Sequence, residues 1–178
     1  MAELTCFEII MIEIKKVLSK DDIVQTAELA REIWTDHFTP IIGSAQVEYM
    51  LEKFQSPDAM TRQISSGYEY FLAVVDDKNV GYMAVVADAD ESSLMISKIY
   101  VKKDVRGSGV GCRFLQHAES ICQEHGFKII WLTVNKYNAD SIAWYERMGF
   151  VNAETMVQDI GNGFIMDDFK MLKKLPEN

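Results

Sequence analysis

The sequence has little cysteine, little proline and no long apolar run. Among its 178 residues, three are cysteine and three are proline. An odd number of cysteines without Cys-x-x-Cys spacing argues against a disulfide framework and against a structural zinc site. No apolar run approaches the roughly 18 residues that a membrane-spanning helix needs. We therefore expect a cytoplasmic protein that holds no metal and binds no membrane.

Basic side chains are also scarce, because 27 acidic residues outnumber 18 basic ones and the formal net charge is −9. This balance disfavours general nucleic-acid binding, which needs a basic face. The excess of acid lies in residues 1–90, whereas residues 91–178 carry 11 charges of each sign. Five basic residues gather between positions 98 and 113. This cluster is either a solvated surface or a sign that the protein binds one anionic and one cationic ligand.

Length and composition predict a single folded domain. Hydrophobic residues make up 48% of the chain and charged residues 25%, which is ordinary for a globular protein and excludes disorder as the main state. The first ten residues carry two acidic groups and no basic one, so they do not resemble a signal peptide. We expect residues 1–10 to be an N-terminal extension and residues 11–178 to form one domain.

Apolar periodicity and turn residues divide the chain into strands and helices. Ser19 and Asp22 form a capping-box pattern that predicts a helix as far as about His37, broken by Pro40 and Gly43. We expect further helices at 46–54, 59–65, 110–125 and 139–148, and strands at 12–17, 71–75, 80–87, 94–101, 129–134, 151–157 and 164–172. This order predicts a mixed α/β (α+β) fold, with a mostly antiparallel, twisted sheet of about seven strands, one parallel pair and flanking helices.

The most informative motif is a glycine-rich segment between a strand and a helix. It reads Arg106-Gly107-Ser108-Gly109-Val110-Gly111. Glycines let the main chain approach a ligand, and the unpaired N–H groups of a helix N-terminus favour an anion. The spacing fits neither a Walker loop nor a Rossmann fingerprint. The motif therefore predicts a phosphate or pyrophosphate site, with a tight turn that binds nothing as the structural alternative.

Two motifs together resemble a known family. The strand Lys98-Ile99-Tyr100-Val101, followed by the glycine-rich segment, is similar to the acetyl-coenzyme A signature of the GNAT N-acetyltransferases. Residues 138–150, NADSIAWYERMGF, are similar to the family's N-x-x-A-x-x-x-Y-x-x-x-G-F, with Ser141 in place of alanine. The resemblance implies the GNAT fold, in which the parallel strands 94–101 and 129–134 splay apart. It also implies acetyl transfer from acetyl-coenzyme A to a primary amine.

Other stretches narrow the resemblance to the branch that contains bacterial spermine/spermidine N-acetyltransferases. These stretches are Trp34–Gly43, Val47–Leu51 and Gly163–Asp168. The branch implies a small cationic acceptor such as a polyamine. A protein N-terminus, a lysine side chain or an aminoglycoside is the alternative acceptor, and a non-catalytic acetyl-coenzyme A-binding module is the alternative function. The oligomeric state stays open, a homodimer included.

The resemblance also implies roles for individual residues. The main chain of Arg106–Gly111 would bind the pyrophosphate, and Asn138 would bind the pantetheine arm. Tyr145 would contact the cofactor and protonate the departing thiolate, for which a phenol is chemically suited. The remaining assignments are Ile99, Tyr100 and Val101, which would pair with the pantetheine amides, and Trp34, Phe38 and Tyr49, which would line the acceptor pocket or else pack in the core.

The general base is the role that the sequence leaves unassigned. Many GNAT enzymes carry a glutamate on the strand before the glycine-rich segment, but Leu94–Lys98 contains no carboxylate. Deprotonation by solvent remains one route. The other is a carboxylate acting through water, and the candidates are Glu69, Asp88, Asp90 and Glu91.

Overall fold

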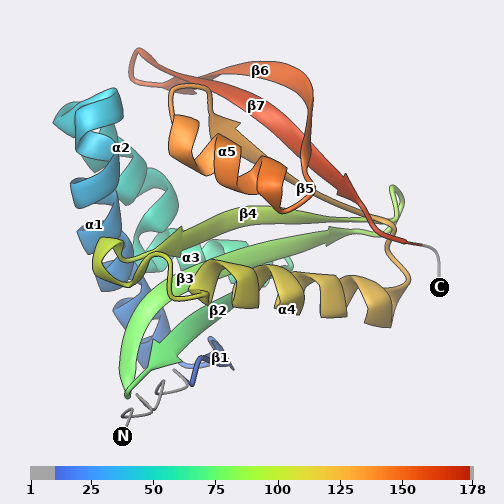
Figure 1. The fold of residues 1–178 in the computed structure, drawn as a ribbon. Helices are drawn as coiled ribbons and strands as arrows, with labels where there is room; N and C mark the ends of the chain where they lie inside the picture. Colours follow the sequence, from blue (N-terminus) through green and yellow to red (C-terminus); the bar gives the residue numbers. More distant parts are fainter. Residues whose placement is uncertain (1–10, 177–178) are drawn as a thin grey trace, which may run out of the picture.

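A computed structural model describes residues 11–176 and shows one seven-stranded sheet flanked by five α-helices (Figure 1). The elements in chain order are β1 (Glu13–Lys16), α1 (Lys20–Ile42), α2 (Ser44–Gln55), α3 (Pro57–Ser65), β2 (Tyr68–Val75), β3 (Lys78–Asp88), β4 (Ser93–Val101), the 3₁₀ turn η1 (Lys103–Val105), α4 (Val110–His125), β5 (Ile129–Asn135), α5 (Ala139–Arg147), β6 (Val151–Gly161) and β7 (Phe164–Lys174). The mixed α/β class is confirmed. The expected N-terminal extension, residues 1–10, lies outside the described part of the chain.

Helices cover both faces of the sheet. The strand order is β1-β2-β3-β4-β5-β7-β6, and every neighbouring pair is antiparallel except β4 and β5. Neighbouring residues of β2 face opposite cores: Phe71 packs with α4, whereas Leu72 packs with α1 and α2. In Figure 1, α4 lies along one side of the sheet and α1–α3 gather at its other side. No helix within residues 11–176 is long and apolar enough to cross a membrane.

The parallel strands β4 and β5 pair at one end and separate at the other. Their register runs from Ser93 opposite Ile129 to Ile96 opposite Leu132, and beyond this point β4 continues to Val101 with no partner on the β5 side. Figure 1 shows the two strands diverging, with α5 beside the gap. The predicted splay is confirmed, and it exposes one main-chain edge of β4.

A β-bulge in β4 changes which face its side chains take. Opposite β3, Ala84 pairs with Lys98, but the next residue, Val85, pairs with Ile96, so Ser97 is the extra residue. A single inserted residue reverses the alternation of a strand. Ile96 therefore packs on the α4 side, while Lys98 lies beside Tyr70 on the side of α1–α3.

Two local predictions need correction. The helix expected to end near His37 continues through Pro40 to Ile42, because the proline lies in its last turn and only one hydrogen bond, to the Asp36 carbonyl, is lost. The Gly43 N–H then closes the helix on the Thr39 carbonyl at 3.0 Å. The loop between β2 and β3 is also shorter than expected. It is a two-residue turn, Asp76-Asp77, with both φ angles positive, as a tight hairpin requires.

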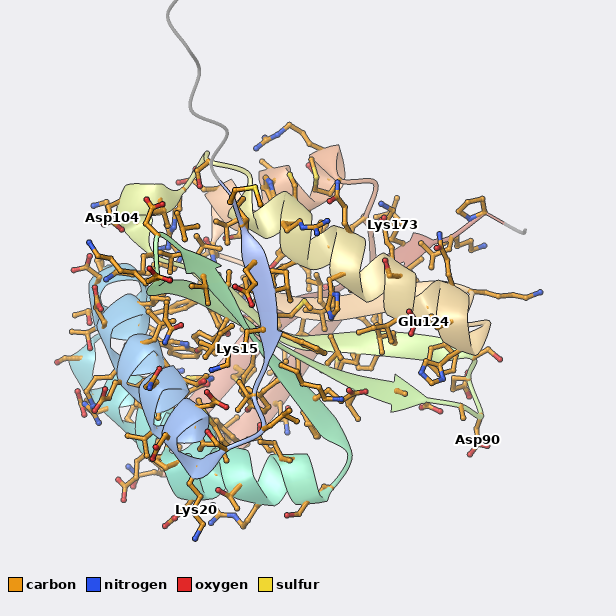
Figure 2. All side chains as sticks on the ribbon, turned by 90° about the horizontal axis from the view of Figure 1, so that it is seen from below. Lys15, Lys20, Asp90, Asp104, Glu124 and Lys173 are labelled. Atoms are coloured by element: carbon orange, nitrogen blue, oxygen red, sulfur yellow. The ribbon has the colours of Figure 1, made fainter. Side chains whose placement is uncertain are left out.

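The capping box at the start of α1 is present as predicted. Ser19 Oγ accepts a hydrogen bond from the Asp22 N–H at 3.0 Å, and Asp22 Oδ2 accepts one from the Ser19 N–H at 3.0 Å. Asp22 Oδ1 also accepts a hydrogen bond from Lys15 Nζ at 2.6 Å, which ties β1 to α1. Figure 2 shows Lys15 on β1 and Lys20 where α1 begins. The Lys15 and Ser19 contacts hold the pKa of Asp22 well below its usual range.

Replacing Asp22 by alanine is expected to lower the free energy of unfolding by about 1–2 kcal/mol, because the helix loses its cap and β1 loses its ion pair. Urea denaturation measures this loss. Asp21→Ala is the matched control, since Asp21 lies in the same first turn but is exposed. Equal losses for the two variants would contradict the role of the cap.

Wild type and Asp22→Ala also test how the stability contribution of Asp22 depends on pH. Because the folded-state pKa of Asp22 is depressed, its stabilising contribution is complete above the ordinary carboxyl pKa of about 4 and declines as the pH falls below that value. The difference in unfolding free energy between wild type and Asp22→Ala should therefore be constant above about pH 5 and shrink in more acidic solution.

Candidate active site

A cavity of about 790 Å³ lies where β4 and β5 separate. This volume falls in the range typical of small-molecule sites. Its lining comes from α1, α2, β4, the glycine-rich segment, α5 and the strands β5–β7, with single residues from α3 and β2. The cavity therefore joins segments that lie far apart in the sequence, and it includes both motifs that carried the family resemblance.

The glycine-rich segment forms one wall of this cavity. Gly107 and Gly109 have φ angles of 85° and 96°, values that side chains rarely allow. Gly109 is the N-cap residue of α4, and the first helical hydrogen bond runs from the Arg113 N–H to its carbonyl at 2.9 Å. The N–H groups of residues 110–112 precede that bond and have no acceptor within the helix. Such free N–H groups at the positive end of a helix are suited to an anion.

The other residues of the segment have different tasks. A Cβ at Gly111 would lie 2.9 Å from Trp144 Cζ2, so this glycine allows α4 and α5 to approach each other. Ser108 faces away from the cavity, with its hydroxyl donating to the Val105 carbonyl at 2.6 Å. Arg106 donates from Nε to the Val101 carbonyl at 3.2 Å, and its Nη1 lies 3.3 Å from His37 Nδ1 of α1. Both Arg106 and His37 line the cavity.

The residues expected to hold the pantetheine arm and the thiolate also meet at the cavity. Ile99, Tyr100 and Val101 line it from the free edge of β4, and Asn138, the N-cap residue of α5, lines it from the opposite wall. Tyr145 is buried on α5, with its ring centroid 5.1 Å from that of Trp144. Burial raises the pKa of the Tyr145 phenol, so the group keeps its proton at neutral pH.

The three aromatic residues predicted for the acceptor pocket separate into two groups. Trp34 and Phe38 line the cavity from α1, with ring centroids 4.5 Å apart, and Trp34 Nε1 donates to the Tyr82 hydroxyl at 3.0 Å. The structure does not bring Tyr49 to the cavity. Its hydroxyl donates to the Ile160 carbonyl at 2.7 Å, and its ring packs on Phe164. Tyr49 thus joins α2 to the β6–β7 hairpin.

The structure places the four candidate carboxylates away from this cavity. Glu69 forms an ion pair with Lys16 on the outer strands. Asp88 and Asp90 line a separate depression at the far end of β3 and β4, where Asp88 Oδ1 accepts a hydrogen bond from the Glu91 N–H at 3.1 Å. None of these four residues lines the cavity that contains the glycine-rich segment.

A different carboxylate, Asp168 of β7, lines the cavity and is only 6% exposed. Burial raises its pKa to about 6, against a hydrogen bond from Thr133 that lowers it. Burial raises the pKa of Tyr100, and the charge of Asp168 adds to this rise. Tyr100, Tyr145 and Asp168 all line the same cavity. The sequence shows an acidic pair, Asp167-Asp168, within an apolar strand, but it does not tell which of the two faces inward.

Lys98 is a second buried charge that the sequence analysis did not single out as a site residue. The Ser97 bulge puts it on the face of β4 that is covered by α1–α3, where it lines the cavity and is 6% exposed. Its Nζ donates to Gln63 Oε1 at 2.7 Å and lies 5.6 and 5.4 Å from the ring centroids of Tyr68 and Tyr70. Burial lowers the pKa of this ammonium to about 8.

Several curated proteins are similar to this chain. It is 24% identical over 165 residues to an uncharacterised N-acetyltransferase of Lactobacillus delbrueckii, covering 89% of this chain and 95% of that protein. It is 25% identical over 161 residues to the spermidine N(1)-acetyltransferase of Thermoplasma acidophilum, covering 88% and 96%. A streptothricin acetyltransferase of Streptomyces lavendulae is 38% identical over 81 residues, which span 45% of this chain and 43% of that protein.

Solved structures share the fold. The PaiA N-acetyltransferase of Thermoplasma acidophilum, solved in complex with coenzyme A, superposes with a TM-score of 0.74 at 24% identity, covering 93% of this chain and 99% of the other. A GCN5-related N-acetyltransferase of Rhodopseudomonas palustris gives a TM-score of 0.76 at 18% identity, covering 92% and 95%. The family model of the acetyltransferase (GNAT) family matches residues 27–150, well over half of the chain, and the chain therefore belongs to that family of N-acetyltransferases.

Proposed function

We propose that this N-acetyltransferase moves the acetyl group of acetyl-coenzyme A to the primary amine of a small acceptor bound in the cavity, with Asp168 as the general base. The observation that carries the proposal is the set of groups that line one cavity. The N-terminus of α4 with its free N–H groups, the buried carboxylate of Asp168 and the buried phenol of Tyr145 all lie in its wall. These are the groups that acetyl transfer from a thioester to an amine requires.

The cofactor position follows from the free hydrogen-bonding groups. The N–H groups at the start of α4 would donate hydrogen bonds to the pyrophosphate of acetyl-coenzyme A, with Arg106 beside them. The free edge of β4, at residues 99–101, would pair with the pantetheine amides as a further strand does, and Asn138 would bind the arm from the α5 side. The thioester would then lie between β4 and Tyr145, close to Asp168.

The proton transfers follow from the two buried ionisable groups. An aliphatic ammonium ordinarily has a pKa of about 10, so it must lose a proton before its nitrogen attacks the thioester carbonyl. Burial raises the pKa of Asp168 and would lower that of a bound ammonium. The difference between the two pKa values becomes smaller, which makes transfer of the proton to the carboxylate easier. The neutral amine then forms the new C–N bond and the C–S bond breaks. The Tyr145 hydroxyl gives its proton to the departing thiolate, and the resulting phenolate takes up the proton that the new amide nitrogen loses.

The acceptor is a small molecule in this proposal because the cavity is lined by buried aromatic and ionisable side chains. The polyamine predicted from the sequence is one such small acceptor, and it draws support from the relative named for spermidine acetylation. A lysine side chain of a protein is the competing acceptor, since a peptidyl-lysine N-acetyltransferase of Salmonella typhimurium is 27% identical over 96 residues. A screen of small amines and lysine peptides with acetyl-coenzyme A and a thiol reagent tests both, because an enzyme frees thiol faster only with an accepted amine.

Replacing Gly109 by valine is expected to lower the affinity for coenzyme A at least about tenfold, because a β-branched residue at a φ of 96° distorts the anion site. Calorimetric titration measures the affinity. Gly126→Val is the matched control, since Gly126 has a φ of 72° at the other end of α4. Near-native affinity of the Gly109 variant for coenzyme A would contradict the assignment of the glycine-rich segment to the cofactor site.

Replacing Tyr145 by phenylalanine is expected to lower kcat about a hundredfold while the affinity for coenzyme A changes less than about twofold, because only the proton donor is lost. Steady-state kinetics and calorimetry together separate the two effects. Tyr137→Phe, at an exposed tyrosine, should leave both unchanged. Unchanged turnover in the Tyr145 variant would mean that water protonates the thiolate.

The proposed role of Asp168 as general base predicts how kcat/KM depends on pH. Below about pH 6 the carboxyl is protonated and cannot take a proton, so kcat/KM for the acceptor should fall tenfold for each unit of pH. Asp168→Asn should lower kcat/KM at least about a hundredfold at neutral pH and remove this acid limb. A variant that retains the limb would exclude Asp168 as the base.

Asp167→Asn is the matched control, because Asp167 is the neighbouring carboxylate, forms an ion pair with Lys136 and does not line the cavity. Its charge contributes to the raised pKa of Asp168. This variant should therefore keep the activity and the acid limb, with the limb moved slightly toward lower pH.

A further inference from the structure

We propose that the acceptor part of the cavity contains an anion subsite formed by Lys98, so that the acceptor carries a carboxylate in addition to its reactive amine. This inference rests on the proposed function for the amine end of the acceptor. It concerns Lys98 of β4, whereas the proposed general base, Asp168, belongs to β7. It names the substrate class as an amino carboxylate in place of a polyamine.

The position of Lys98 is fixed by neutral neighbours. Gln63 Oε1 accepts hydrogen bonds from Lys98 Nζ at 2.7 Å and from the Tyr70 hydroxyl at 2.6 Å. Gln63 Nε2 donates to the Phe54 carbonyl at 3.1 Å, which sets the orientation of the amide. The Ser97 hydroxyl lies 3.5 Å from Nζ. The ammonium is therefore held in place at the wall of the cavity by groups that do not neutralise its charge.

No carboxylate balances this charge within residues 11–176. The ion pairs of that part of the chain involve other lysines and arginines. None of the ion pairs found among the described residues joins Lys98 to Asp168. The rings of Tyr68 and Tyr70 give some electrostatic support, as aromatic faces do for a cation.

An unpaired ammonium in a cavity is costly to bury, and a bound anion offsets that cost. A single positive charge with donor N–H groups matches a carboxylate, which carries one negative charge and accepts hydrogen bonds. The same charge repels a second ammonium. A polyamine bound at Asp168 would thus bring another positive charge into a cavity that already contains Lys98, whereas an amino carboxylate would meet a complementary group at each end.

The experiment compares three matched series of acceptors: linear ω-amino carboxylates of increasing chain length, n-alkylamines and α,ω-diamines. For wild type, kcat/KM of the best amino carboxylate should exceed that of its matched alkylamine by about tenfold or more, since a charge-assisted hydrogen bond is gained. Lys98→Met should remove this preference and leave the alkylamines nearly unchanged. Preference of wild type for the diamines, or an equal loss for all three series in the variant, would overturn the subsite.

Two further variants serve as controls. Lys98→Gln also removes the charge but keeps a hydrogen-bonding side chain beside Gln63, so it should lose the same preference even if Lys98→Met folds poorly. Lys78→Met removes one positive charge from an exposed position of β3 and should retain the preference of wild type.

A binding measurement separates this inference from the proposed reaction. Hexanoate has the carboxylate but no amine, and calorimetry can follow its binding to the protein saturated with coenzyme A. Binding to wild type and to Lys78→Met, with at least about a tenfold loss in both Lys98 variants, would support the subsite even if no amine were acetylated. Acetylation of alkylamines without hexanoate binding would support the reaction and overturn the subsite.

Discussion

The separation of β4 from β5 is the constraint on which the rest of the site depends. Parallel strands in a sheet normally satisfy each other's main-chain groups along their whole length. Here the pairing stops at Ile96 and Leu132, and the remainder of β4 keeps only its β3 partner. Beyond β5 the sheet continues with β7 and β6, and in Figure 1 this part of the sheet diverges from β4 and leaves the open edge with the cavity beside it.

The bulge at Ser97 sets which face of the sheet Lys98 lies on. Without this extra residue, Lys98 would follow Ile96 onto the α4 face and meet the apolar core there. With it, Lys98 and Tyr100 share the face covered by α1–α3, while Ile99 returns to the α4 core. A local irregularity of one strand thus places the charge that we propose to meet the acceptor. The strand edge that would bind the cofactor and the side chain proposed to select the acceptor both belong to the four residues Lys98–Val101.

The charges of the cavity differ from those of the whole chain. The protein carries a net charge of −9, yet its cavity contains one buried ammonium, one buried carboxylate and the arginine of the glycine-rich segment. Surface charge acts over a distance and is screened by salt, whereas a buried charge acts on the group that it touches. The acidic composition suggested a cationic acceptor, whereas the two buried charged side chains that line the cavity support the proposed acceptor with charges of both signs.

The features that the sequence predicted correctly are those that depend on local interactions. The capping box of Ser19 and Asp22, the glycines at positive φ in the segment 106–111, and the helix that begins after Asn138 depend on residues only a few positions apart. Tertiary structure decided which side chains face the cavity. Tyr49 bonds to the Ile160 carbonyl instead of lining the cavity, and Lys98 lines the cavity because of the bulge at Ser97. On β7, Asp168 lines the cavity and Asp167 does not. Those outcomes depend on strand register and on packing between distant segments, and a shift of one residue in register reverses every side chain of a strand.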